Sequence, residues 1–241
     1  MVRLLTRRPS RHTERYQFDA TRFNALPDIE VASADMKAKG KLSLAFSALA
    51  PIFARHNMCD SWGISLLHNH WQVEDGELPI QDAIRTDSPL EYETTPRQAP
   101  FTKKYWPSIL AARDSHDAGL DAVEFSTQPD VETANCLLVR NSQFVSEVCS
   151  ALRENNLADT FGLIVPKEVS SADLEFVEFN EDKVSLLKET VSATNDPQNL
   201  IETSWRIVPT EVAGKCEKSC FSKCVVSGGK HSHSHPKVHK P

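Results

Sequence analysis

The spacing of apolar residues predicts two amphipathic helices. Residues 33–56 carry apolar side chains three or four positions apart, as one helical face requires, at Leu42, Phe46, Leu49 and Phe53. We expect Pro51 to kink or end the last turn of this helix. A second apolar stripe predicts a helix over residues 142–154, with Ser142 as its N-cap.

Residues 62–74 change to period two, which is the alternation of a β-strand. Asp75-Gly76 follows with the sequence of a type I′ turn, and residues 78–81 return as a second strand. This pattern predicts a β-hairpin. Pro79 has no N–H to donate, so we expect the returning strand at the edge of a sheet.

Further strands are expected at residues 120–126, 161–165, 174–179 and 201–207. Residues 183–193 fit either a helix or a strand. Residues 84–119 contain four prolines and no sustained period, so we expect a long loop there. Its aromatic side chains should pin this loop to the body, since a disordered linker would contain fewer of them.

This order of elements predicts an α+β fold, with a mostly antiparallel sheet and two packed helices. We expect one α+β domain over residues 30–210. Residues 1–29 would form a basic N-terminal arm with an extended entry segment, and residues 211–241 a flexible tail rich in cysteine and histidine. Both basic ends are expected to be disordered.

The net charge of −6 is distributed unevenly along the chain. Residues 1–15 carry +4 and residues 215–241 carry +5, which leaves −15 on residues 16–214. Phosphate contacts require a basic face on the folded body, so this distribution argues against specific nucleic-acid binding. The longest apolar run, residues 44–53, has about half the length of a membrane span, and no transmembrane segment is expected.

The chain lacks the apolar core of a secretory signal and contains no N-x-S/T sequon. We therefore expect a cytoplasmic location, where the six cysteines would be free thiols or metal ligands rather than disulfides. The arginine-rich, acid-poor start also resembles a short mitochondrial transit peptide, which gives an alternative location.

The strongest candidate for chemistry is the pattern His68-x-His70-x-x-x-Glu74. Alternate strand residues point the same way, so the two imidazoles would converge on one divalent ion such as zinc or iron. The spacing is that of the first cupin motif, but cupins turn before the glutamate, whereas the turn here follows it. Glu74 would therefore lie on the order of 13 Å from His70 along the strand.

A metal at this place would need a third ligand from elsewhere, and the sequence offers His56, His116 and Glu124. The competing interpretation is that both histidines are hydrogen-bonded residues on the core side of a sheet, with no metal or catalytic role. The sequence does not decide between the two.

A second candidate lies in the expected tail. Cys216, Cys220 and Cys224 follow one another four positions apart, the spacing of a helical face, and a histidine-rich segment with His231 and His233 comes after them. Thiolate and imidazole are ligands that Zn²⁺ and Cu⁺ prefer, so these residues could form a metal site. The alternative is an exposed tail with reactive thiols.

Two segments resemble uncharacterised proteins of filamentous fungi: LLHNHWQVEDGE (residues 66–77) and ETSWRIVPTEVAGKCEKSCFSKC (residues 202–224). In those proteins an LHxH strand precedes an acidic turn, and a late strand ending in Trp precedes a Cys-containing tail. The resemblance implies an intracellular α+β protein and brings no activity and no catalytic residues.

The function is therefore open between three hypotheses. The first is an intracellular module that binds a small molecule or a protein in a groove at the His68–His70 hairpin. The second is a metal-dependent enzyme that uses His68 and His70, with Glu74 as a further catalytic candidate. The third is metal binding by the tail. G-x-S-x-G, GxGxxG and P-loop motifs are absent from the sequence.

Overall fold

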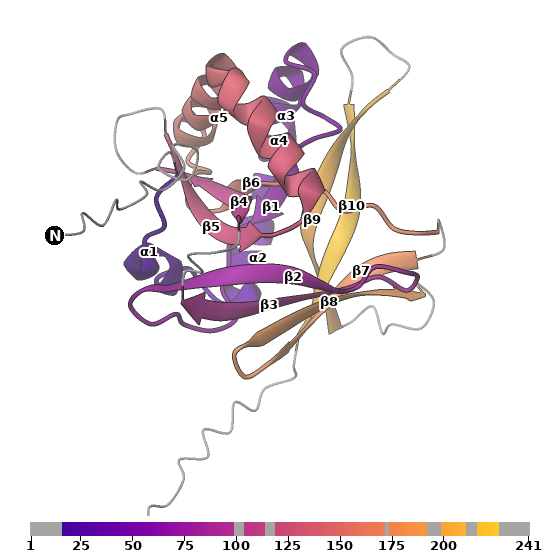
Figure 1. The fold of residues 1–241 in the computed structure, drawn as a ribbon. Helices are drawn as coiled ribbons and strands as arrows, with labels where there is room; N and C mark the ends of the chain where they lie inside the picture. Colours follow the sequence, from indigo (N-terminus) through magenta and orange to yellow (C-terminus); the bar gives the residue numbers. More distant parts are fainter. Residues whose placement is uncertain are drawn as a thin grey trace, which may run out of the picture.

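The computed structural model of the chain is a closed ten-stranded β-barrel (Figure 1). The structure describes residues 16–98, 104–113, 119–171, 174–191, 199–210 and 216–226. In chain order the strands are β1 (Gly63–Leu66), β2 (Glu77–Arg85), β3 (Glu91–Gln98), β4 (Trp106–Ala112), β5 (Leu120–Ser126), β6 (Phe161–Ile164), β7 (Leu174–Glu181), β8 (Val184–Val191), β9 (Leu200–Pro209) and β10 (Cys216–Val225). Around the barrel they follow as β1-β6-β4-β5-β2-β3-β8-β7-β10-β9, and β9 pairs with β1 to close it.

Five helices accompany the barrel in the described part of the chain: α1 (Ala20–Asn24), α2 (Ile29–Ala38), α3 (Lys41–Arg55), α4 (Pro129–Arg140) and α5 (Ser142–Glu154). Helices α3, α4 and α5 lie together on one side of the barrel (Figure 1). Phe53 on α3 and Phe144 on α5 are in edge-to-face contact, with ring centroids 5.1 Å apart. Trp62 joins α4 to the start of β1 through a hydrogen bond from its Nε1 to the carbonyl oxygen of Ala134, at 3.2 Å.

The hydrophobic core lies between these helices and the outer surface of the barrel, whereas polar and apolar side chains together line the barrel interior. Strand β1 shows the division. Ile64 and Leu66 are fully buried in the core, and Ser65 between them faces the cavity inside the barrel. Because successive strand residues point to opposite sides, one strand serves both compartments.

The predicted α+β class is wrong. Strands make up 41% of the structure, and they close on themselves instead of forming a sheet with two packed helices. Most of the strand pairs are antiparallel, but β2 with β5 and β7 with β10 are parallel. The main error lies in residues 84–119, which contain β3 and β4 rather than one long loop.

Prolines led to the prediction of a loop, but two of them lie in strands at positions where no backbone N–H is needed for a hydrogen bond. Pro79 on β2 and Pro96 on β3 face each other directly. Neither residue has an N–H to donate, so the two form a non-hydrogen-bonded pair of the antiparallel ladder. On their other sides, β2 pairs with β5 only at Ile80 and Gln81, and β3 pairs with β8 only up to Thr94. The missing N–H groups therefore face no partner strand.

The predicted hairpin between residues 62–74 and 78–81 is also wrong. Strand β1 ends at Leu66 and pairs with β6 and β9, while β2 pairs with β3 and β5. Residues 75 and 76 do form a turn in which Gly76 has a positive φ of 79°, but Asp75 does not have a positive φ, so it is not the expected type I′ turn. That turn leads into β2 from an irregular segment, residues 67–76, and it does not join two paired strands.

The helix predictions need three corrections. The expected helix over residues 33–56 is divided into α2 and α3 at Gly40, whose φ of 59° is left-handed. The N-cap of α5 is Asn141, whose side chain accepts a hydrogen bond from the backbone N–H of Phe144, and not Ser142. Helix α4 was not predicted. The strands expected at residues 120–126, 161–165, 174–179 and 201–207 are confirmed as β5, β6, β7 and β9.

The residues assigned to the C-terminal tail include a barrel strand. Cys216–Val225 form β10, which pairs with β9 along its whole length and with β7 at its end. A spacing of four is even, so it fits one face of a strand as well as one face of a helix. The sequence pattern alone could not separate the two. Residues 1–15 and 227–241, with the rest of the predicted arm and tail, lie outside the described residues.

We predict that Gly162→Ala destabilises the barrel by about 2–3 kcal/mol, because overpacking a dense interior costs energy of this order. Gly162 lies on β6 between β1 and β4, and a Cβ there would approach the carbonyl oxygen of Leu110 to 2.4 Å. Urea denaturation measures the loss. Gly119→Ala is the matched control: its Cβ would meet only the flexible end of Arg113, and an equal loss in both variants would contradict the prediction.

Candidate metal centre

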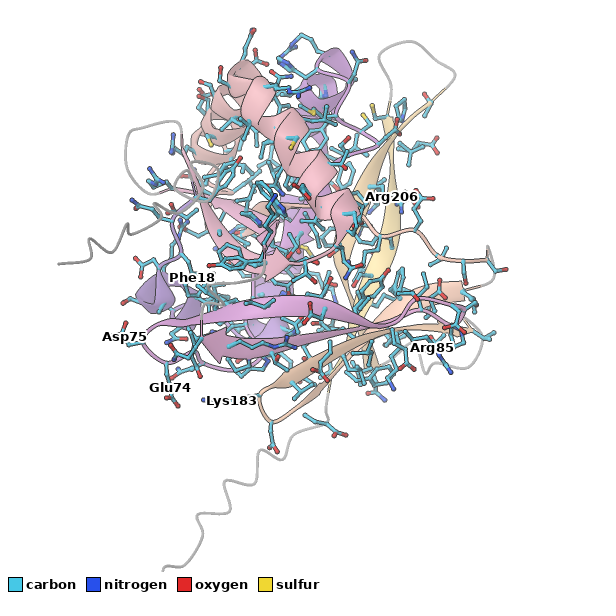
Figure 2. All side chains as sticks on the ribbon, viewed as in Figure 1. Phe18, Glu74, Asp75, Arg85, Lys183 and Arg206 are labelled. Atoms are coloured by element: carbon cyan, nitrogen blue, oxygen red, sulfur yellow. The ribbon has the colours of Figure 1, made fainter. Side chains whose placement is uncertain are left out.

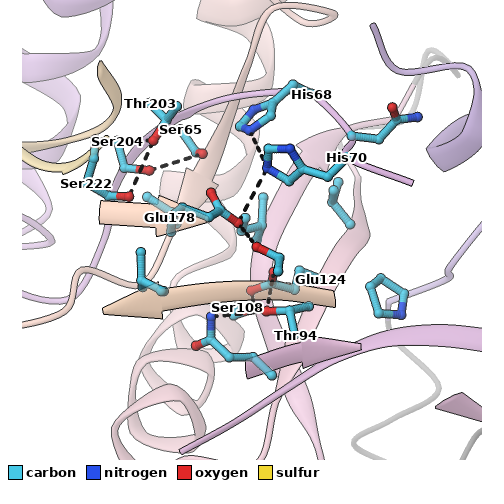
Figure 3. Close-up of a pocket in the computed structure, with 18 of the residues that line it drawn as sticks. Ser65, His68, His70, Thr94, Ser108, Glu124, Glu178, Thr203, Ser204 and Ser222 are labelled. Carbon is cyan, nitrogen blue, oxygen red and sulfur yellow. Dashed lines mark hydrogen bonds and ion pairs between the residues drawn. The ribbon is translucent and has the colours of Figure 1, made fainter. Parts of the chain in front are cut away.

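Four potential metal ligands converge at one place in the barrel. They are His68, His70, Glu178 and Cys224, and one donor atom of each lies within 4.8 Å of every other. Figure 3 shows the two imidazoles and the carboxylate of Glu178 directed toward one another. The residues come from the segment after β1, from β7 and from β10, so three separate parts of the chain contribute.

The barrel topology brings Glu178 and Cys224 together. Strands β7 and β10 run parallel, and Glu178 is the direct neighbour of Cys224 in their register. Side chains of directly paired residues project from the same side of a sheet, so carboxylate and thiol meet inside the barrel. Cys224 is fully buried.

The two histidines lie on an irregular segment. Contacts with α1 and with the residues beside α1 hold this segment in place. The side chain of Asn24 forms two hydrogen bonds with the backbone of Val73, each 2.9 Å long. Asn69 Nδ2 donates to the carbonyl oxygen of Phe23 at 3.1 Å, and the indole of Trp71 packs on the ring of Phe23. These contacts on either side of His70 direct the segment into the barrel.

A backbone hydrogen bond sets the tautomer of His68. Its Nδ1 lies 2.7 Å from the carbonyl oxygen of Leu66, which can only accept, so Nδ1 carries the proton. Nε2 then has a free electron pair and faces His70 Nε2 at 3.1 Å. An imidazole oriented in this way is the usual state of a histidine ligand.

Four of the distances between donor atoms are close to those of a tetrahedral coordination shell. Around Zn²⁺, nitrogen ligands lie about 3.3 Å from each other and about 3.6 Å from a sulfur ligand. Here the nitrogens of the two histidines are 3.1 Å apart, and Cys224 Sγ lies 3.7 and 3.5 Å from them. His70 Nε2 and Glu178 Oε1 are 3.4 Å apart.

The charges of the cluster are strongly coupled. Burial alone would raise the pKa of Glu178, but the charge and hydrogen bond of His70 hold it well below its ordinary value. Burial, and then the charge of Glu178, raise the pKa of the Cys224 thiol, which donates to Glu178 Oε2 at 2.9 Å. Burial and the neighbouring His70 lower the pKa of His68 to about 4. Without an ion, the cluster thus contains a carboxylate, a thiol and a neutral His68.

The cluster borders a cavity of ≈ 80 Å³ inside the barrel, and all ten strands contribute to its lining. At roughly 10–15 Å³ for each water position, there is room for on the order of five waters. Register shifts beside Ser108 on β4 and beside Ser222 on β10 interrupt the alternation of these strands. As a result Ser108 and Ile109 both line the cavity, as do Phe221 and Ser222.

A second carboxyl group lies in the same cavity. Ser108 Oγ donates to Glu124 Oε1 at 2.8 Å, and Thr94 Oγ1 donates to Glu124 Oε2 at 3.2 Å (Figure 3). Burial raises the pKa of Glu124 to about 7 in spite of these hydrogen bonds. Glu124 therefore titrates near neutral pH, unlike Glu178.

Of the residues predicted from the sequence, His68, His70 and Cys224 come together, and the others do not join them. Glu74 lies at the periphery of the molecule beside Lys183, with a side chain 76% exposed (Figure 2). The turn that follows Glu74 does not bring its carboxylate back toward the histidines.

The remaining candidates lie at other places. His56 pairs with Glu147 on α5. Cys216 is near the carbonyl oxygen of Ala50, and Cys220 donates to the carbonyl oxygen of Ser222. Glu124 shares the cavity but is not one of the four clustered ligands. His116, His231 and His233 lie outside the described residues.

Sequence reasoning missed Glu178. A signal existed, because Glu178 alternates with Leu174 and Phe176 on one face of the stretch Leu174–Phe179, whereas the other acidic residue, Glu175, lies on the opposite face. An inward carboxylate needs a partner, but the sequence does not say which strand lies next to β7.

Comparisons of the chain with protein-family models, with curated proteins and with solved structures found no match. The resemblance to fungal proteins therefore stays a prediction. Among the described helices, none combines the length and apolar character that crossing a bilayer requires.

We predict that Glu124→Gln stabilises the protein at high pH and not at low pH. The pKa of Glu124 rises from 4.5 to about 7 on folding, so the folded protein binds this proton more tightly than the unfolded chain does. The folded protein therefore loses stability as pH rises through this range. The neutral amide escapes this loss, and its advantage should grow to about 3 kcal/mol by about pH 8. Urea denaturation at a series of pH values measures the difference. The exposed control Glu74→Gln should give a flat profile, and a flat profile for Glu124→Gln would refute the assignment.

Proposed function

We propose that this protein binds one divalent transition-metal ion, with zinc as the preferred ion, through His68, His70, Glu178 and Cys224. The observation that carries the proposal is the convergence of four donor atoms, each within 4.8 Å of the others, from three separate parts of the chain. Two imidazoles, a thiolate and a carboxylate are all ligand types that Zn²⁺ accepts.

Charge balance supports an ion rather than a purely hydrogen-bonded cluster. With the thiol deprotonated, Glu178 and Cys224 supply two negative charges, and a divalent cation makes the buried site neutral. Without the ion, Glu178 is a buried carboxylate that depends on its contact with His70 for compensation. The electron pair of His68 Nε2, which accepts a hydrogen bond from His70 Nε2 at 3.1 Å, would instead bind the metal.

The ligand types favour zinc over the hard cations. Mg²⁺ and Ca²⁺ prefer shells of six or more oxygen ligands, whereas this cluster offers one carboxylate with two nitrogens and one sulfur. Iron(II) accepts similar ligands, and elemental analysis separates the two metals.

The ion would have a structural role in the barrel. Four protein ligands complete a tetrahedral shell, which is the arrangement of structural zinc sites, whereas catalytic sites keep one position for water. It would tie the segment after β1 to β7 and β10, across 156 residues of sequence between His68 and Cys224. Metal binding is thus favoured over the metal-dependent enzyme, because an enzyme would need one of the four ligands to leave.

We predict that Cys224→Ser removes one equivalent of metal from the purified full chain. Loss of the thiolate takes away the strongest ligand, and the shorter oxygen of serine does not replace it. Elemental analysis measures the metal content, and Cys220→Ser on the same strand is the matched control. Any metal bound by the C-terminal histidines is common to both variants, so only their difference counts. Equal metal content in the two variants would refute the proposal.

We predict that one equivalent of Zn²⁺ raises the thermal stability of the metal-free wild type and not that of His70→Ala. An ion that binds only the folded state at a thousandfold excess over its Kd adds about 4 kcal/mol. Thermal denaturation with and without zinc measures the effect. His56→Ala, whose histidine pairs with Glu147 away from the cluster, should respond like the wild type. A full response in His70→Ala would place the zinc elsewhere.

A further inference from the structure

The barrel cavity contains buried polar groups that neither the protein nor the proposed metal satisfies. Gln81 is 5% exposed, and its Oε1 has no hydrogen-bond partner within the described chain. Lys167 is 8% exposed, and among the described residues its ammonium group forms no hydrogen bond and no ion pair. Both residues line the cavity, and neither belongs to the metal cluster.

The surroundings of Lys167 favour an anion. Its Nζ lies 4.0 Å from the centre of the Tyr92 ring, which provides a cation–π contact on one side. Burial lowers the pKa of Lys167, while the charges of Asp130 and Glu124 oppose this shift from a distance. A buried cation without a hydrogen-bonded counter-ion is costly, so a negatively charged ligand would stabilise it.

Gln81 and Lys167 belong to one polar environment. Gln81 Nε2 donates to Thr94 Oγ1 at 3.4 Å, and Thr94 Oγ1 donates to Glu124 Oε2 at 3.2 Å. Lys167 in turn acts on Glu124 through its charge. The cavity that Glu124 lines therefore also contains an unused acceptor and an unused cation.

We propose that the barrel cavity binds a small hydroxy-carboxylate, whose carboxylate pairs with Lys167 and whose hydroxyl group donates to Gln81 Oε1. The complementarity is specific, because the ligand must supply both a negative charge and a hydrogen-bond donor. A hydrophobic ligand would leave both groups unsatisfied.

The cavity also limits the charge and size of the ligand. Lys167 is a single cation, and the carboxyl groups of Glu124 and Glu178 face the same cavity, which disfavours a phosphate dianion. A cavity of ≈ 80 Å³ accommodates only a few carbon atoms. The site uses none of the four metal ligands, so it stands independently of the proposed metal.

Isothermal titration calorimetry on the full chain tests the proposal with three probes of similar size: glycolate, acetate and ethylene glycol. Acetate lacks the donor and ethylene glycol lacks the charge. We expect glycolate to bind about tenfold more tightly than acetate, and ethylene glycol to bind more weakly than either. Equal affinity for glycolate and acetate would overturn the proposal. No binding of glycolate would also overturn it, and would mean that the cavity contains solvent only.

Two variants locate the site. Lys167→Met and Gln81→Leu should each weaken glycolate binding about tenfold or more, because each leaves one ligand group unpaired in a buried place. Lys183→Met, at an exposed turn between β7 and β8, is the matched control and should bind like the wild type. Thermal denaturation checks that each variant folds. If Lys167→Met fails to fold, Gln81→Leu and the three probes decide the question.

The metal-ligand variant Cys224→Ser separates this proposal from the preceding one. We expect it to retain glycolate affinity whatever its metal content. Glycolate binding that disappears in Cys224→Ser and persists in Lys167→Met would place the ligand on the metal and overturn the cavity site, while the metal proposal would stand. If metal content is unchanged in Cys224→Ser and glycolate binding is lost in Lys167→Met, the metal proposal is refuted and the cavity site is supported.

Discussion

The structure depends on the compensation of charges buried inside a closed β-barrel. Closing the sheet leaves no edge strands, but it also encloses every inward side chain in a space that helices and neighbouring strands shield from water. Glu124, Glu178 and Lys167 all face this space. Each of them needs a partner, since an uncompensated buried charge would cost several kcal/mol.

The barrel provides such partners in different ways. Hydroxyl groups of Ser108 and Thr94 bind Glu124, and burial keeps this carboxyl protonated up to about neutral pH. Glu178 instead retains its charge and draws His70 and Cys224 toward it. One cavity thus contains two carboxyl groups with opposite shifts of pKa, and the difference follows from the residues that surround each.

The proposed metal and the proposed ligand address separate parts of this cavity. The metal would neutralise Glu178 and the Cys224 thiolate and tie the segment after β1 to β7 and β10. The ligand would pair with the ammonium group of Lys167 and with Gln81 Oε1, which have no hydrogen-bond partner in the described part of the chain. Together they would compensate the charges of Glu178 and Lys167 inside the barrel.

Local pattern in the sequence determined much of the secondary structure, including β5, β6, β7, β9 and most of α3 and α5. It also determined that His68 and His70 face a common space, although on an irregular segment rather than on a strand. Alternation reveals which residues share a side, but not which side water reaches, and so the burial of Glu124, Glu178 and Lys167 in the interior was not predictable. Closure of the barrel, and with it the meeting of Glu178 and Cys224 with the histidines, was decided by strand pairing between distant segments. Such pairing arises from packing over the whole molecule, which no local pattern contains.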